Sequence, residues 1–143
     1  MNKVFVSAVL YGVNKGINNL MSSKAGTVIC RYISKEMFNF LMNRGVASPD
    51  MKNKDLEEML VNKLKLAKKI EIIEDDKNVI LKIYQPTLTD FLEEMMKNKV
   101  PLILCPFLAT VTEVYRNRGV RIFLKDGNPT EYGIELVFSK TRH

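Results

Sequence analysis

The chain is poor in the side chains from which most active sites are built. Its 143 residues include one histidine, two cysteines and no tryptophan. A zinc site needs three or four Cys, His or carboxylate ligands, and an activated nucleophile needs a nearby base. The single histidine, His143, is the last residue, a position where side chains are usually mobile. We therefore expect no intrinsic metal site, no cofactor and no catalytic activity carried by this chain alone.

Sequence motifs for common chemistries are missing as well. The chain has no phosphate-binding P-loop, no dinucleotide-binding glycine fingerprint and no nucleophile elbow. Cys30 and Cys105 are too few for a disulfide framework. The apolar run near residue 10 is too short and too interrupted for a membrane span or a signal peptide, so we expect a cytoplasmic protein. Three acidic pairs are interpreted as solvated surface, because adjacent helical residues point apart and the middle pair sits in a turn: Glu57-Glu58, Asp75-Asp76 and Glu93-Glu94.

Charge and composition describe one ordinary globular domain spanning residues 1–143. Apolar residues make up 46% and charged residues 27%, and a chain of this length can bury a core without metals or disulfides. The net charge of +6 permits weak attraction to nucleic acid. However, the only dense basic cluster, Lys63–Lys69, is typical of a solvated surface. Because no helix-turn-helix signature accompanies it, we do not expect a nucleic-acid partner.

Helical periodicity dominates the first half of the chain. Apolar residues spaced four and three apart from Val6 to Leu20 predict a helix over about Lys3–Ser22, with a heptad seam along one side. The same kind of spacing predicts helices over about Lys24–Asn43 and Lys54–Ala67. The first two helices would form an amino-terminal helical part, residues 1–45, followed by a linker.

The hydrophobic period changes after the third helix. Two Ile- and Val-rich runs, Lys69–Glu74 and Asn78–Tyr84, are joined by an acidic turn and predict a β-hairpin. Pro86 should break the second strand, and a short helix should then run to about Asn98. The next segment is apolar throughout its first half, and Pro106 suits the first turn of a buried helix.

A second hairpin is expected to close the chain. Its strands would be Val120–Lys125 and Glu131–Phe138, with the turn at Asp126-Gly127-Asn128-Pro129, and the tail from Ser139 should fray. The order is then α-α-α-β-β-α-α-β-β. Adjacent strands joined by tight turns predict an antiparallel sheet of two hairpins packed with helices, which is the α+β class.

One short motif stands at the start of the apolar helix. Cys105-Pro106-Phe107 opens the helical run Leu108–Tyr115, and Asp126-Gly127 precedes the last strand. With the order of elements over Lys54–Phe138, these residues resemble the 4-vinyl reductase domain family. These predicted hydrocarbon-binding proteins are similar in fold to TRAPP vesicle-tethering subunits and haem-based nitric-oxide sensors. The resemblance implies an apolar ligand pocket and dimerisation. The family's cysteine pair around the last turn is absent from this hairpin, which argues against a metal or reductase role.

Candidate binding residues follow from the apolar segments. Cys105 has two interpretations, because a helix N-terminus stabilises a thiolate whereas apolar surroundings favour a buried thiol. Arg116 and Arg118 either satisfy the carboxyl end of their helix or bind the acidic group of a ligand or partner. The candidates for lining the pocket are Met37, Phe40, Phe91, Cys105, Phe107 and Leu108.

Two functions of different classes remain open. The first is a binding or sensing module for a hydrophobic molecule, acting as a homodimer through the seam of the first helix. The alternative is a structural assembly subunit whose apolar faces are all core or interface and which binds no small molecule. Gly12 and Gly16 bear on both, since they either form a notch for close helix contact or merely weaken the helix.

Overall fold

The α+β class and the expected order of elements are confirmed. The structure is a computed structural model that describes residues 2–141, so the prediction about His143 lies outside the described residues. Over the described residues the chain forms helices α1 (Lys3–Leu20), α2 (Ser23–Asn43), α3 (Asn53–Glu58), a π-helix (Met59–Lys63), α4 (Thr89–Lys97) and α5 (Pro106–Asn117), and strands β1 (Ala67–Glu74), β2 (Asn78–Pro86), β3 (Arg121–Pro129) and β4 (Gly133–Thr141).

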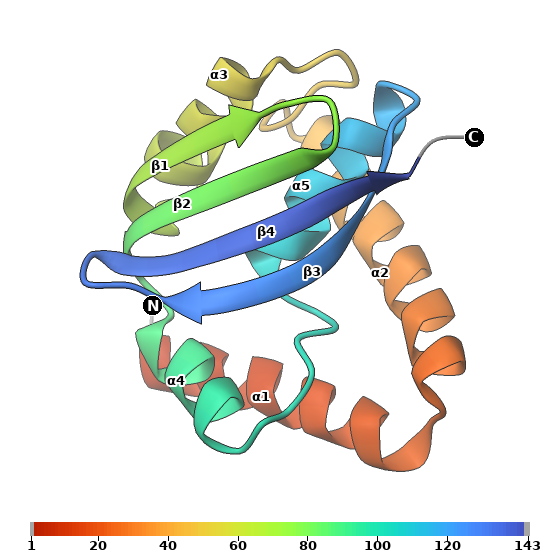
Figure 1. Cartoon of the computed structure of the whole chain (residues 1–143), viewed down its shortest axis with the longest axis vertical. Helices are drawn as coiled ribbons and strands as arrows, with labels where there is room; N and C mark the ends of the chain where they lie inside the picture. Colours follow the sequence, from red (N-terminus) through yellow and green to blue (C-terminus); the bar gives the residue numbers. More distant parts are fainter. Residues whose placement is uncertain (1, 142–143) are drawn as a thin grey trace.

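The four strands form one antiparallel sheet in the order β1-β2-β4-β3. The two hairpins are joined through their second strands, β2 and β4, so the first strand of each lies at an edge. Figure 1 shows α3 and α5 behind the sheet, α1 and α4 below it, and α2 beside it. The core fills the space between the sheet and α5. Its fully buried side chains include Leu81, Ile83, Val111, Tyr115, Leu136 and Phe138.

The predicted third helix is wrong at its carboxyl end. The α-helix ends at Glu58 and continues as a π-helix, in which the Leu64 N–H donates to the Met59 carbonyl five residues back. Lys65 then takes a left-handed conformation, with φ at 53°, and Ala67 already belongs to β1. Apolar spacing alone predicted helix to Ala67, because the residues that face the core keep a helical period up to Leu64.

The turn of the last hairpin also differs from the prediction. Strand β3 continues through Asp126-Gly127 to Pro129, and the chain reverses just afterwards, where the Thr130 N–H donates to the Gly133 carbonyl. The register between β3 and β4 shifts at Lys125, which forms a bulge. The dipeptide that resembled the family's turn therefore lies within a strand.

The last strand of this sheet extends further than expected. Ser139–Thr141 pair with β2 and β3, so the prediction of a frayed tail is wrong for these residues.

At the other edge of the sheet, the carboxylate of Glu57 accepts a hydrogen bond from the Ile72 N–H at 2.9 Å. Glu57 was interpreted as solvated surface, but it occupies a donor on edge strand β1 that would otherwise face water or another chain.

A buried asparagine connects α1 to the segment that leads into α5. Asn14 is 0% exposed, and its amide group donates to the carbonyls of Leu10 and Leu104 at 2.8 and 2.7 Å. Its Oδ1 accepts from the N–H groups of Ile103 and Leu104 at 3.0 and 2.8 Å. One side chain thus satisfies four backbone groups and fixes the extended segment immediately before Cys105.

The predicted heptad seam of α1 is partly buried against the core and partly exposed. Val6 and Leu10 are partly buried against the core, whereas Leu20 is 84% exposed. The opposite side of the helix leaves Phe5 and Val9 exposed as well. Part of the seam predicted for a dimer therefore packs within the chain, and the outward surface of α1 is apolar too.

Candidate functional site

An apolar groove lies between α2, the segment after the π-helix and the start of α5. It has a volume of about 710 Å³. The residues that line it come from α2 (Tyr32, Ile33, Glu36, Met37, Phe40, Leu41), from the segment before β1 (Leu64, Leu66) and from α5 (Pro106, Thr110). Of the six candidates predicted from the sequence, Met37 and Phe40 line this groove.

Local structure explains how three elements meet here. The α2 helix begins after Ser22, whose hydroxyl accepts from the Ala25 N–H at 3.2 Å, and it keeps a regular period to Asn43. Ile33, Met37 and Phe40 are therefore on one side of it. The π-helix and the turn that follows carry two leucines to the facing wall, and Pro106 is the first residue of α5.

The groove offers apolar surface and almost no charge. Glu36 is the only residue among those that line it whose side chain is ordinarily charged at neutral pH. Phe40 and Tyr32 are 52% and 67% exposed, which leaves two aromatic rings in water at the rim. The guanidinium of Arg44 lies 3.8 Å from the centroid of the Phe40 ring, a cation–π contact that holds this ring at the edge. The chemistry of such a site suits the binding of apolar groups.

Three of the predicted pocket residues lie in the core instead. Phe91, Cys105 and Phe107 are each at most 2% exposed, and none of them lines the groove. Burial raises the pKa of the Cys105 thiol to about 11 and outweighs the N–H groups of Leu108 and Phe107, which lower it. The thiol therefore stays protonated at neutral pH, and the structure places Cys105 in the core.

The remaining candidates lie away from the groove. Leu108 lines a separate hollow of about 330 Å³ together with Arg116, which pairs with the buried carboxylate of Glu113. Arg118 is held by the protein itself: its Nε donates to the Met51 carbonyl at 3.0 Å, and its Nη1 donates to Asn53 Oδ1 at 2.9 Å. The six apolar candidates and two arginines thus do not form a single site.

Sequence reasoning missed a polar cluster at one end of the core. Glu74 Oε1 accepts from the Tyr115 hydroxyl at 2.6 Å, and Oε2 accepts from Lys140 at 2.6 Å. Burial alone would raise the pKa of Glu74, but the hydrogen bonds from Lys140, Tyr115 and Asn53 together lower it to about 2. Burial and the neighbouring Glu74 raise the pKa of Tyr115. These residues are up to 87 positions apart in sequence, and nothing local signals their meeting.

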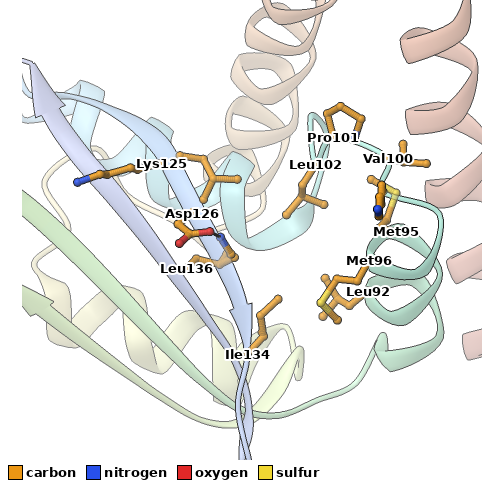
Figure 2. A pocket seen from close by; sticks show the side chains of 13 residues that line it. Leu92, Met95, Met96, Val100, Pro101, Leu102, Lys125, Asp126, Ile134 and Leu136 are labelled. Carbon is orange, nitrogen blue, oxygen red and sulfur yellow. Dashed lines mark hydrogen bonds between the residues drawn. The ribbon is translucent and has the colours of Figure 1, made fainter.

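A further hollow of about 380 Å³ lies between α4 and the β3–β4 hairpin. Figure 2 shows Met95 and Met96 on α4 facing Ile134 and Leu136 on β4 across this space. Its rim carries lysines and Asp126, so it is less uniformly apolar than the groove. Methionine side chains adapt readily, and this hollow is accordingly a secondary candidate for an apolar ligand.

Within residues 2–141, no three His, Cys, Asp or Glu side chains are grouped as a metal ion would require. None of the helices described is both long and apolar enough to span a membrane.

Comparison with known proteins places the chain in one family. No family model matches the sequence, and no solved structure matches it. Uncharacterized protein MJ0758 of Methanocaldococcus jannaschii is 34% identical over 142 residues, which cover 98% of this chain and 89% of that protein. The chain belongs to the family of MJ0758. Since the alignment spans both α1 and β4, this relative shares the amino-terminal helical part as well as the sheet.

Proposed function

We propose that the protein binds a neutral hydrophobic small molecule in the apolar groove and performs no chemistry on it. The observation that carries the proposal is the character of the groove. Eight of its ten lining residues are apolar or aromatic, and its volume of about 710 Å³ is in the range typical of small-molecule pockets. The resemblance to the 4-vinyl reductase domain points to the same ligand class.

The energetics favour an apolar ligand over a polar one. Each Å² of apolar surface removed from water contributes about 25 cal/mol, and the groove exposes rings and aliphatic chains that gain from being covered. A polar ligand would lose hydrogen bonds to water, since only three lining side chains, those of Tyr32, Glu36 and Thr110, could replace them. Met37 can adjust its rotamer to ligands of different shape.

The test uses N-phenylnaphthylamine, a neutral apolar dye whose fluorescence rises in apolar sites. We expect Met37→Glu to abolish the increase, because a carboxylate in the groove would have to be desolvated. Ile73→Glu is the matched control, since Ile73 is an exposed apolar residue on β1 outside the groove. Equal fluorescence from wild-type and Met37→Glu proteins would sink the proposal.

The second candidate function, an assembly subunit, is favoured by a different observation. Among residues 2–141, nine of the twelve exposed large hydrophobic residues lie in the amino-terminal helical part: Val4, Phe5, Val9, Leu20, Met21, Val28, Ile29, Tyr32 and Phe40. Clustered apolar surface of this kind marks interaction sites, and we propose a second copy of the chain as the partner. Native mass spectrometry should then find a dimer that Phe5→Lys converts to monomer. A monomer at all concentrations would contradict this candidate.

The expected cellular location is also a proposal. Cys30 and Cys105 are both free and buried. Unpaired cysteines suit a reducing compartment, which supports a cytoplasmic protein.

A further inference from the structure

The structure contains a second cleft, on the other side of α2, with a different chemical character. We propose that this cleft binds an anionic amphiphile, a free small molecule with an acidic head group and an apolar tail. The proposal goes beyond the apolar groove and shares no residue with it except Tyr32 at one rim. We call this site the basic cleft.

The basic cleft consists of two adjoining hollows between α2, α5 and β3. Their volumes are about 370 and 330 Å³. Because six residues line both hollows, the two are parts of one elongated cleft. The shared residues are Arg31, Thr112, Glu113, Arg116, Ile122 and Phe123.

One half of the cleft carries an excess of positive charge. Arg31, Lys35 and Arg121 line it, and among the described residues none of the three forms an ion pair. The only carboxylate in the lining is Glu113, which is 4% exposed and already paired with Arg116. Four cations against one neutralised anion leave a net charge of +3 around a single hollow, which attracts an anion.

The positions of these cations are not explained by helix ends. Arg31 and Lys35 are four residues apart in the interior of α2 and share one side of it. Arg121 is the first residue of a strand. Only Arg116 stands in the last turn of a helix, where a cation is favourable without any ligand. Its pairing with Glu113 holds the guanidinium in place, so less side-chain freedom is lost when an anion binds.

The other half of the cleft suits an apolar tail. Leu102 and Ile103 from the loop before α5, Leu108 from α5 and Leu124 from β3 line it. Phe123 lies between the two halves and is 47% exposed. A molecule that places its acidic group among the arginines would therefore lay its tail along these side chains, and both halves would contribute to affinity.

The experiment is an NMR titration of the uniformly ¹⁵N-labelled protein with octanoate. We expect amide shifts that saturate and that map to the end of α5 and the start of β3. Octan-1-ol has the same tail without the charge, and inorganic phosphate has charge without the tail, so each should bind at least about tenfold more weakly. Shifts of the same size and affinity with octan-1-ol would overturn the proposal, because the cations would then play no part.

Charge variants test whether octanoate binds in the basic cleft or is attracted only by the overall positive charge of the protein. Arg31→Gln/Arg121→Gln should raise the dissociation constant of octanoate by about tenfold or more, because hydrogen bonds to charged groups are lost. Lys68→Gln/Lys97→Gln removes the same charge from exposed positions outside the cleft and should leave the constant unchanged. Equal loss in both variants would overturn the site.

Vesicles distinguish a free ligand from a membrane lipid. The proposal expects octanoate to bind in solution and vesicles containing anionic phospholipid to cause no cleft-dependent sedimentation of the protein. Sedimentation with vesicles but no response to octanoate would overturn it in favour of a membrane surface. The apolar groove is tested by the neutral dye and the Met37→Glu variant, whereas the basic cleft is tested by octanoate and the arginine variants. A negative result for one site is therefore distinguishable from a negative result for the other.

Discussion

Single polar side chains fix the geometry around α5. Asn14 satisfies four backbone groups of α1 and of the segment before Cys105, and Glu74 collects hydrogen bonds from Tyr115 and Lys140. Neither role could be predicted from the sequence, because an asparagine inside an apolar helix and a glutamate at a strand end look like ordinary surface residues. What identifies them is a partner about 90 or 41 positions away.

The buried hydrogen bonds of Asn14 should contribute strongly to stability. Asn14→Ala should lower the free energy of unfolding by about 2–4 kcal/mol, because the N–H groups of Ile103 and Leu104 and the carbonyl of Leu104 lose their partner while buried. Urea denaturation measures the change. Asn19→Ala, at an exposed position of the same helix, should change stability by about 0.5 kcal/mol or less. Similar values for the two variants would refute the structural role of Asn14.

Glu74 should confer stability that is lost in acid. Its pKa is lowered from 4.5 to about 2 on folding, so the unfolded chain takes up the proton first. The stabilisation is fully present above about pH 4.5 and is lost as the pH falls towards 2. Since Glu74 is partly exposed, we expect about 1 kcal/mol after solvent screening. Unfolding curves of wild type and Glu74→Gln should converge over this pH range, and a constant difference between them would contradict the assignment.

At the scale of elements, periodic segments were predictable and irregular ones were not. The helices α1, α2 and α4 end within about two residues of their predicted limits, because a buried face imposes the 3.6-residue period on the sequence. The π-helix was missed, since its wider turn leaves the apolar spacing almost unchanged. The turn of the last hairpin was misplaced because Asp-Gly is a common turn dipeptide, whereas here it follows a bulge.

Glycine substitutions test the corrected hairpin directly. A Cβ on Gly133 would lie 2.2 Å from the Ile83 carbonyl oxygen, and φ there is 156°, so Gly133→Ala should cost at least about 2 kcal/mol of stability. At Gly127 the nearest atom is a leucine methyl carbon at 3.3 Å, which can move slightly, and Gly127→Ala should cost less than half as much. Thermal denaturation of both variants gives the comparison. A larger loss of stability for Gly127→Ala than for Gly133→Ala would contradict this hairpin and indicate a turn at Asp126-Gly127.

At the scale of the whole molecule, apolar surface is distributed unevenly. The sheet and α5 enclose the core, while most of the large hydrophobic side chains that the described residues expose to water lie in the amino-terminal helical part. Of the six pocket candidates named from the sequence, Met37 and Phe40 line the apolar groove. The sequence could not separate them from Phe91, Cys105 and Phe107, because a hydrophobic pattern is the same whether a side chain faces the core or a cavity.

Ligand binding and self-association are competing explanations for the exposed apolar surface of the groove and of the amino-terminal helical part. Ligand binding predicts that only the groove responds to a small apolar molecule. Assembly predicts that the outward surfaces of α1 and α2 respond to protein concentration. Both can be followed through methyl groups, since Met37 and Leu64 line the groove whereas Val9 and Leu20 lie exposed on α1.

Methyl NMR with a neutral hydrocarbon therefore distinguishes ligand binding in the groove from self-association. Protein labelled at Met, Ile, Leu and Val methyl groups would be titrated with cyclohexane at constant protein concentration. Hydrophobic ligand binding predicts saturable shifts at Met37 and Leu64 and none at Val9 or Leu20. Shifts absent from the groove, with changes at Val9 and Leu20 that follow dilution of the protein alone, would contradict the proposed function and favour an assembly subunit.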